Sequence, residues 1–291
     1  MNPRVRIVSA IFLIILATLT IWAWRANAGK AEADSQFAVS SASAVIISLD
    51  LKRGKFPVRC YEPQGAPKAI LVFGSGDGGW KSWEEKAARG LASAGFKVIG
   101  WDCRAYAAKP YDASGLGADV AQMAKEGLKR AARDGITGEK VPIPLFYGGY
   151  STGAEQAVGA AASNLQHRES SVGGAKEEIS QYCPSGLLLV APGERGRYGI
   201  TLADLLGRTP RGPTSFALKE LAPILGTIPV AQIHGSLDPL DSTEWLQFLK
   251  GPHRLNTLSG FGHFFGDAGT DLRKTLVEDA EWLVRQSSSS H

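Results

Sequence analysis

The sequence predicts an α/β fold, with a mostly parallel sheet of about eight strands and helices on both of its faces. Short runs of continuous apolar, often β-branched residues recur along the chain, and helical patterns separate them. Strands that are apolar throughout belong to a sheet covered on both sides, and helical crossovers make neighbouring strands parallel. The 291 residues, 44% hydrophobic and 21% charged, have the composition of a folded globular chain, which we expect to form one large domain.

The predicted domain spans residues 44–286 and opens with two strands, Ala44–Leu51 and Pro57–Tyr61. The first helix should have Ser82 as its N-cap, with Glu85 three residues later completing a capping box. Further strands are expected at Ala69–Phe73, Lys97–Trp101, Ile143–Tyr147, Gly186–Ala191, Val230–His234 and His253–Leu258, and helices at Ser82–Ala94, Ala118–Ala132, Gly153–Leu165 and Thr270–Gln286. The polar residues 287–291 should form a disordered tail.

The segment Pro192–Pro229 interrupts the alternation of strands and helices with Gly and Pro residues. We expect a lid-like insertion over the sheet edge rather than a second domain. It carries four arginines, Arg195, Arg197, Arg208 and Arg211. If the insertion folds over the site, these guanidinium groups would meet a substrate phosphate; otherwise they form an ordinary solvated surface.

The first 28 residues have the pattern of an export signal. Arg4 and Arg6 precede the uncharged run Ile7–Trp24, and Ala26-Asn27-Ala28 matches a signal-peptidase site. Because the run nearly reaches the about 20 residues that span a bilayer, an uncleaved inner-membrane anchor is the alternative to a signal peptide. Both predict that the body of the chain lies outside the cytoplasm, in the periplasm of a Gram-negative cell. The Ala- and Ser-rich residues 29–43 then form a linker.

The charge and the cysteines exclude other classes of protein. The net charge is +4, but three of the 32 basic residues lie before Gly29 with no acid, which leaves 29 basic against 28 acidic residues. Together with the lack of a basic cluster, this argues against a nucleic-acid partner. Cys60, Cys103 and Cys183 fit neither a CxxC pair nor a zinc site, and three are too few for a disulfide scaffold. We expect structural cysteines, with one disulfide plus a free thiol as the alternative.

The sequence Gly149-Tyr150-Ser151-Thr152-Gly153 is a G-x-S-x-G motif between a predicted strand and a predicted helix. A sharp strand-to-helix turn strains the serine backbone, and side chains at the flanking glycine positions would clash. Such a turn exposes the hydroxyl of Ser151 at a helix N-terminus. In this context the motif predicts a nucleophile and an α/β-hydrolase fold, whereas the bare pattern also occurs in glycine-rich turns.

A serine nucleophile needs a base and an orienting acid, which follow it along the chain in this fold. His263 lies in the loop after the last strand and is the candidate base, because the other histidines lie within or at the start of strands, after the nucleophile helix or in the tail. Asp238 follows the strand Val230–His234 and is the preferred acid. Asp241 and Asp267 remain alternatives, and either Asp238 or Asp241 could instead cap a helix near Ser242.

The loop Gly74–Trp80 after the strand Ala69–Phe73 predicts part of an oxyanion hole. Backbone N–H groups of Thr152 and of Asp77 or Gly78 should hold the negative charge. The loop lacks the lysine of a phosphate-binding P-loop. Asp77 would meet an amine of the substrate or else stabilise its own turn. Trp80 and Tyr150 are further candidates for substrate contact, with packing as the alternative for Trp80.

These motifs, in this order, resemble the VirJ and AcvB family of bacterial virulence proteins over most of the chain after about residue 65. The resemblance is carried by Ser75-Gly76-Asp77-Gly78-Gly79-Trp80, Gly100-Trp101-Asp102, Gly149-Tyr150-Ser151-Thr152-Gly153 and Gly262-His263-Phe264 with Gly266-Asp267. It implies a periplasmic protein linked to type IV secretion in some hosts, and an esterase that removes the amino acid from lysyl-phosphatidylglycerol. The segment Gly235–Asp241 is less acidic than the corresponding family segment often is.

The sequence therefore predicts a periplasmic serine ester hydrolase with Ser151, His263 and Asp238 as its triad, and no metal or organic cofactor. The expected substrate is a membrane lipid that carries an aminoacyl ester. The alternatives are a general carboxylesterase or lipase, and a non-catalytic partner of secretion-system proteins.

Overall fold

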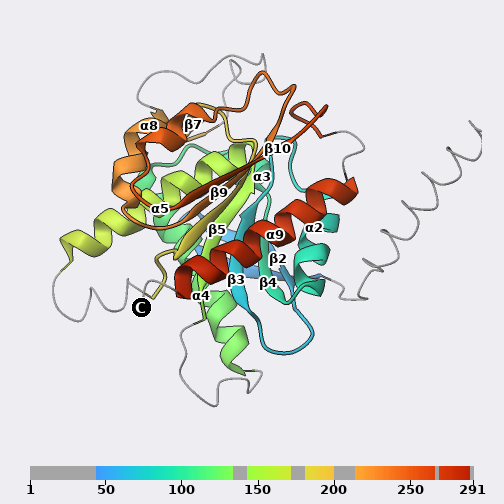
Figure 1. Cartoon of the computed structure of the whole chain (residues 1–291). Helices are drawn as coiled ribbons and strands as arrows, with labels where there is room; N and C mark the ends of the chain where they lie inside the picture. Colours follow the sequence, from blue (N-terminus) through green and yellow to red (C-terminus); the bar gives the residue numbers. More distant parts are fainter. Residues whose placement is uncertain (1–43, 134–142, 172–180, 200–213, 266–268, 289–291) are drawn as a thin grey trace, which may run out of the picture. The chain divides into compact units, whose positions relative to one another are not determined.

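The protein is described by a computed structural model that covers residues 44–133, 143–171, 181–199, 214–265 and 269–288 (Figure 1). The predicted export signal 1–28 and the linker 29–43 lie outside these residues. Within the described ranges, no helix has the length and apolar character needed to cross a membrane.

An eight-stranded sheet in the order β1-β2-β4-β3-β5-β6-β9-β10 forms the centre of the domain. The two β1–β2 and β2–β4 pairs are antiparallel and all later pairs are parallel, so the predicted sheet is confirmed. Its strands are β1 (Val45–Leu51), β2 (Gly54–Tyr61), β3 (Ala69–Gly74), β4 (Phe96–Trp101), β5 (Leu145–Tyr150), β6 (Gly186–Val190), β9 (Val230–Gly235) and β10 (His253–Leu258).

Helices cover both faces of the sheet, as predicted. The helices α2 (Ser82–Ser93) and α9 (Gly269–Ser288) pack on one face, and α4 (Ala113–Arg133) and α5 (Thr152–Ser170) pack on the other (Figure 1). Successive residues of β3 alternate between two cores. Leu71 and Phe73 join the core beneath α2 and α9, whereas Ile70 and Val72 join the core beneath α4 and α5.

The order of β4, β3 and β5 positions the site. After β3 the chain moves outward to β4 and then returns past β3 to β5, so β3 lies between them. The carboxyl ends of β3 and β5 therefore lie side by side, with Gly74 paired to Gly149. Ligands of open α/β sheets bind at such reversals, because the loops there diverge and leave a crevice.

Several helix ends differ from the prediction. The N-cap of α2 is Lys81 rather than Ser82, and its backbone N–H bonds to Glu84 at 2.9 Å, so the capping carboxylate is not Glu85. α4 begins five residues before the predicted Ala118. α9 continues through two residues of the predicted tail, where the hydroxyls of Ser287 and Ser288 donate to the carbonyl of Val284.

The described part of the segment Pro192–Pro229 packs on α5. An antiparallel pair, β7 (Arg195–Arg197) and β8 (Ser215–Ala217), is followed by α8 (Leu218–Leu221) and the 3₁₀ helix η1 (Ala222–Leu225). Phe216 lies over Gly159 of α5, where a Cβ would be only 3.0 Å from its ring. Residues 200–213, which the lid prediction includes, lie outside the described residues, so the lid stays a prediction.

All three cysteines are buried, as expected for structural residues, and no disulfide joins them. Burial raises the pKa of the Cys60 thiol to about 11 and also raises the pKa values of Cys103 and Cys183. They are therefore uncharged and unreactive in the folded protein.

Candidate active site

Ser151 occupies the sharp turn between β5 and α5. Its backbone has φ 50° and ψ −119°, a left-handed conformation that strains a residue with a side chain. A Cβ at Gly149 would overlap the carbonyl group of Gly153, and a Cβ at Gly153 would overlap that of Gly74. The two glycines therefore let α5 start directly against the end of β3, as the motif predicts.

The structure brings the three predicted triad residues together. Nε2 of His263 lies 3.0 Å from Oγ of Ser151, and Nδ1 of His263 lies 2.8 Å from Oδ2 of Asp238. The Asp238 carboxylate is buried, and its other oxygen accepts hydrogen bonds from the backbone N–H groups of Leu240 and Asp241. These bonds fix the carboxylate, and the carboxylate in turn fixes the imidazole with Nε2 toward the serine.

Asp241, the alternative acid, pairs with a different histidine. Its Oδ2 lies 2.7 Å from Nδ1 of His234, and its Oδ1 accepts a hydrogen bond from the side-chain amide of Gln232. Burial raises the pKa of Asp241 to about 6. The 3₁₀ helix η2 (Glu244–Phe248) has Thr243 as its N-cap, so neither aspartate caps it. Asp267 lies outside the described residues.

The glycine-rich loop after β3 forms a tight turn beside the nucleophile. The N–H of Gly79 donates to the carbonyl of Gly76, which puts Asp77 and Gly78 at the two central positions. A Cβ at Gly76 would lie 3.8 Å from the Cβ of Ser151. The loop thus lies where oxyanion donors are needed, and the choice of Thr152 with Asp77 or Gly78 stays a prediction.

Two acidic residues to which the sequence analysis assigned no role here hold this loop. Glu84 is buried and bonds to the backbone N–H groups of Gly76 and Lys81, and burial raises its pKa. Asp102 accepts hydrogen bonds from the N–H of Trp80 at 3.2 Å and from Ala105 at 2.9 Å, where it caps α3 (Cys103–Ala107).

The contacts of Trp80 and Tyr150 are mainly internal. The indole of Trp80 stacks on Tyr61, lies over Gly100 and donates to Glu85, so it packs the domain. The hydroxyl of Tyr150 donates to the backbone carbonyl of His263 at 2.8 Å. Tyr150 therefore positions the loop of the base. Neither set of contacts supports the predicted contact with substrate.

Asp77 is exposed in the loop, where its carboxylate can reach a ligand. Of the four arginines in the insertion, Arg195 donates to the hydroxyl of Ser215 at 3.1 Å and Arg197 lies on the same strand, β7. Arg208 and Arg211 lie outside the described residues.

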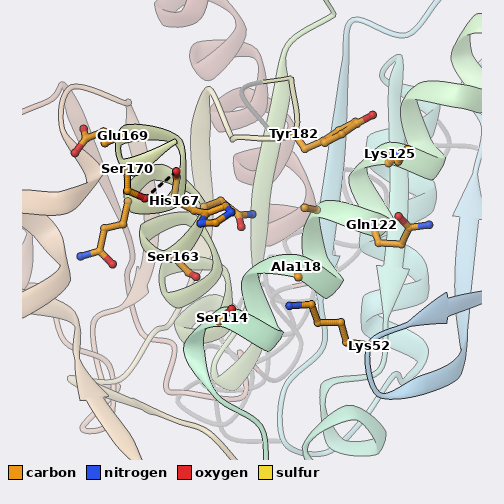
Figure 2. A pocket seen from close by; sticks show the side chains of 13 residues that line it. Lys52, Ser114, Ala118, Gln122, Lys125, Ser163, His167, Glu169, Ser170 and Tyr182 are labelled. Atoms are coloured by element: carbon orange, nitrogen blue, oxygen red, sulfur yellow. Dashed lines mark hydrogen bonds between the residues drawn. The ribbon is translucent and has the colours of Figure 1, made fainter. Parts of the chain in front are cut away.

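A pocket of about 870 Å³ lies between α4 and α5 (Figure 2). Its α5 residues run from Ser163 to Ser170, which places them about 18 Å or more along the helix from Ser151. The Ser170 hydroxyl donates to the backbone carbonyl of His167 rather than to its ring (Figure 2). This pair is not a nucleophile with its base, and the candidate active site is the one at Ser151.

Comparison with solved structures shows the same fold at low sequence identity. The chain is similar to a hyperthermophilic esterase from the archaeon Pyrobaculum calidifontis (17% identity, TM-score 0.54, 84% of this chain and 88% of that chain). It is also similar to a dienelactone hydrolase from Anabaena variabilis (19% identity, TM-score 0.53, 81% of this chain and 95% of that chain). No curated protein matches the chain.

A family model described as bacterial virulence protein (VirJ) matches residues 68–180. This segment contains three of the four motifs that carry the resemblance found in the sequence: the glycine-rich loop, Gly100-Trp101-Asp102 and the Ser151 motif. The resemblance to the VirJ family is therefore confirmed over residues 68–180, and the fold of the chain is that of the α/β-hydrolases.

Proposed function

We propose that the protein is a serine ester hydrolase. The observation that carries the proposal is the hydrogen-bonded series Ser151–His263–Asp238 at a strained turn. Ser151 attacks the ester carbonyl while His263 takes its proton and passes it to the leaving alcohol. Asp238 holds the imidazole in the tautomer that accepts this proton.

The oxyanion of the tetrahedral intermediate is held by the N–H of Thr152 and that of Asp77 or Gly78. Water, activated by His263, then hydrolyses the acyl-enzyme and returns the serine to its starting state. Both half-reactions use the same residues and need no cofactor.

The preferred substrate is an aminoacyl ester of a phospholipid such as lysyl-phosphatidylglycerol, cleaved in the periplasm. The family match supports this choice, as does the exposed carboxylate of Asp77 in the loop beside Ser151, because it suits a substrate with an ammonium group. The export pattern of residues 1–28 supports a site of action at the outer face of the inner membrane.

The test follows free lysine released from vesicles that contain lysyl-phosphatidylglycerol, with Ser151→Ala as the control. We expect release by the wild type alone. Reaction of Ser151 with a fluorophosphonate probe but no lysine release would exclude this substrate and leave a general carboxylesterase or lipase. No reaction of the folded protein with the probe would exclude the hydrolase and favour a binding partner of the secretion system.

A further inference from the structure

Large apolar side chains are exposed on the two loops that carry the acid and the base. Leu237 is 68% exposed, Leu240 is 57% exposed and Phe264 is 81% exposed. We call these three residues the apolar rim. An exposed cluster of large apolar side chains is costly in water and marks an interaction surface when it is contiguous.

The apolar rim is tied to the triad by hydrogen bonds and ring contacts. The N–H of Leu237 donates to the carbonyl of Phe261, and the N–H of Leu240 donates to the Asp238 carboxylate. The ring of Phe264 meets the ring of His263 edge-on, with 5.5 Å between the centroids. Whatever covers the apolar rim therefore lies beside the Ser151–His263 pair.

An apolar crevice adjoins the rim on the side of Tyr150. Trp83, Tyr150, Phe264 and Leu272 form its apolar wall, and Lys86 with Arg273 also line it. Trp83 meets the ring of Tyr150 edge-on at 4.8 Å. With a volume of only about 50 Å³ the crevice is too small for a hydrocarbon chain, but Lys86 and Arg273 at its edge bring cationic groups beside Phe264 of the apolar rim.

Lys81 brings positive charge to the glycine-rich loop, in addition to Lys86 at the crevice. Lys81 is exposed at the start of α2, and a Cβ built at Gly78 would lie 2.6 Å from its Nζ. Lys81 thus lies at the glycine-rich loop, where Asp77 is also exposed, and the exposed Lys86 lines the crevice together with Phe264 of the apolar rim. A surface that combines apolar side chains and lysines is complementary to an anionic bilayer.

The position of the apolar rim also distinguishes between occupants. A protein seated beside Ser151 would obstruct the approach of substrate from water. A bilayer has no such drawback, since it carries the ester itself. We propose that the apolar rim docks on the surface of an anionic lipid bilayer, so that a lipid ester at that surface faces Ser151. This inference rests on the proposed function, because it assigns the source of the ester that Ser151 attacks.

The native cysteines make a site-specific test practical, because all three are buried and unreactive. A single introduced cysteine, Leu237→Cys, is labelled with an environment-sensitive fluorophore. Ile46→Cys is the matched control, since Ile46 is 65% exposed but lies on the edge strand β1. Vesicles of phosphatidylglycerol with brominated acyl chains quench only fluorophores that enter the bilayer, whether or not residues 1–28 anchor the chain.

We expect quenching at position 237 to exceed that at position 46 by about fivefold or more, and to be weaker with phosphatidylcholine vesicles. Equal quenching at the two positions, or none at 237, overturns the docking. Equal quenching with the two lipids overturns the anionic preference. A fluorophosphonate reaction of the same wild-type protein tests the nucleophile separately, so failure of the docking is distinguishable from failure of the proposed function.

A second measurement compares one ester presented in vesicles and as a short soluble analogue. The triple variant Leu237→Ser, Leu240→Ser, Phe264→Ser should lower the ratio of vesicle to soluble turnover by about tenfold or more. The control variant Val45→Ser, Ile46→Ser, Leu255→Ser removes comparable exposed apolar residues from the two edge strands and should change the ratio less than about twofold. The same ratio in both variants contradicts the inference.

Discussion

Asp238 and Asp241, three residues apart, each pair with a different histidine and have different roles. Asp238 and Asp241 lie in the same loop, and Asp238 accepts the backbone N–H of Asp241. This turn directs one carboxylate to His263 and the other to His234. His234 and Asp241, with Gln232 beside them, hold this loop in place, whereas it is His263 whose Nε2 lies 3.0 Å from Oγ of Ser151.

Replacing each aspartate by asparagine separates these roles. Asp238→Asn should lower kcat/KM for a soluble ester by about 10³–10⁴-fold, because the amide favours the wrong imidazole tautomer. Asp241→Asn should lower it by less than about tenfold, since it changes only the anchor of the loop. Steady-state kinetics, with circular dichroism as a check of folding, make the comparison. A larger loss for Asp241→Asn than for Asp238→Asn would show that Asp238 is not the acid of the triad.

At the scale of secondary-structure elements, the strand β5, the turn at Ser151 and the helix α5 depend on backbone contact. The glycines of the motif leave room for the carbonyl groups of Gly74 and Gly153, where a Cβ would overlap them. Such an overlap involves backbone on both sides, so no side-chain rotation can relieve it.

Gly149→Ala should therefore destabilise the protein by about 3 kcal/mol or more, or prevent folding. Gly90→Ala, in the last turn of α2, is the matched control, because the nearest atom outside its own helix lies 3.9 Å from the added Cβ. There the alanine should stabilise the protein by about 0.5–1 kcal/mol through its higher helix propensity. Urea denaturation of both variants gives the comparison, and equal effects of the same sign would contradict it.

The sequence was sufficient for elements with strong local signals and insufficient for those fixed by contacts distant along the chain. Continuous apolar runs predicted the sheet, and the spacing of the motifs located Ser151 and His263. The choice between Asp238 and Asp241 depends on how one turn orients two carboxylates, which composition does not encode. Spacing alone fits two capping boxes equally well, Lys81 with Glu84 and Ser82 with Glu85. The sequence therefore predicts Glu85 as the capping carboxylate, whereas Glu84 caps the helix in the structure. The predicted start of α4 is too late because Ser114, Gly115 and Gly117 are poor helix formers and interrupt the helical pattern.

At the scale of the whole molecule, buried carboxylates make stability depend on pH. Asp279 of α9 lies against Asn256 and Arg254, and burial raises its pKa from 3.8 to about 6. The folded state therefore holds a proton between these values that the unfolded chain has already released. The contribution of Asp279 is most favourable below pH 4 and is lost as the pH rises through about 6.

Asp279→Asn removes this group while keeping its shape. The wild type should lose stability relative to this variant as the pH rises from 4 to 6. The loss in its unfolding free energy should be at most about 1.4 kcal/mol per pH unit. Urea denaturation at several pH values measures it. Asp50→Asn, the same change at an exposed residue of β1, is the control and should not produce this slope. A flat difference for Asp279→Asn would show that its carboxyl does not titrate in this range.

Burial in one core, beneath α4 and α5, shields the three cysteines from oxidants such as those of the predicted periplasmic location. No covalent cross-link limits how far the chain can open, so packing alone keeps the thiols from oxidants in the compartment to which residues 1–28 are predicted to deliver it. Each complete opening exposes three groups that can form wrong bonds within or between molecules. The useful lifetime of the protein is then set by how seldom it opens, a property of the barrier to unfolding rather than of the free-energy difference.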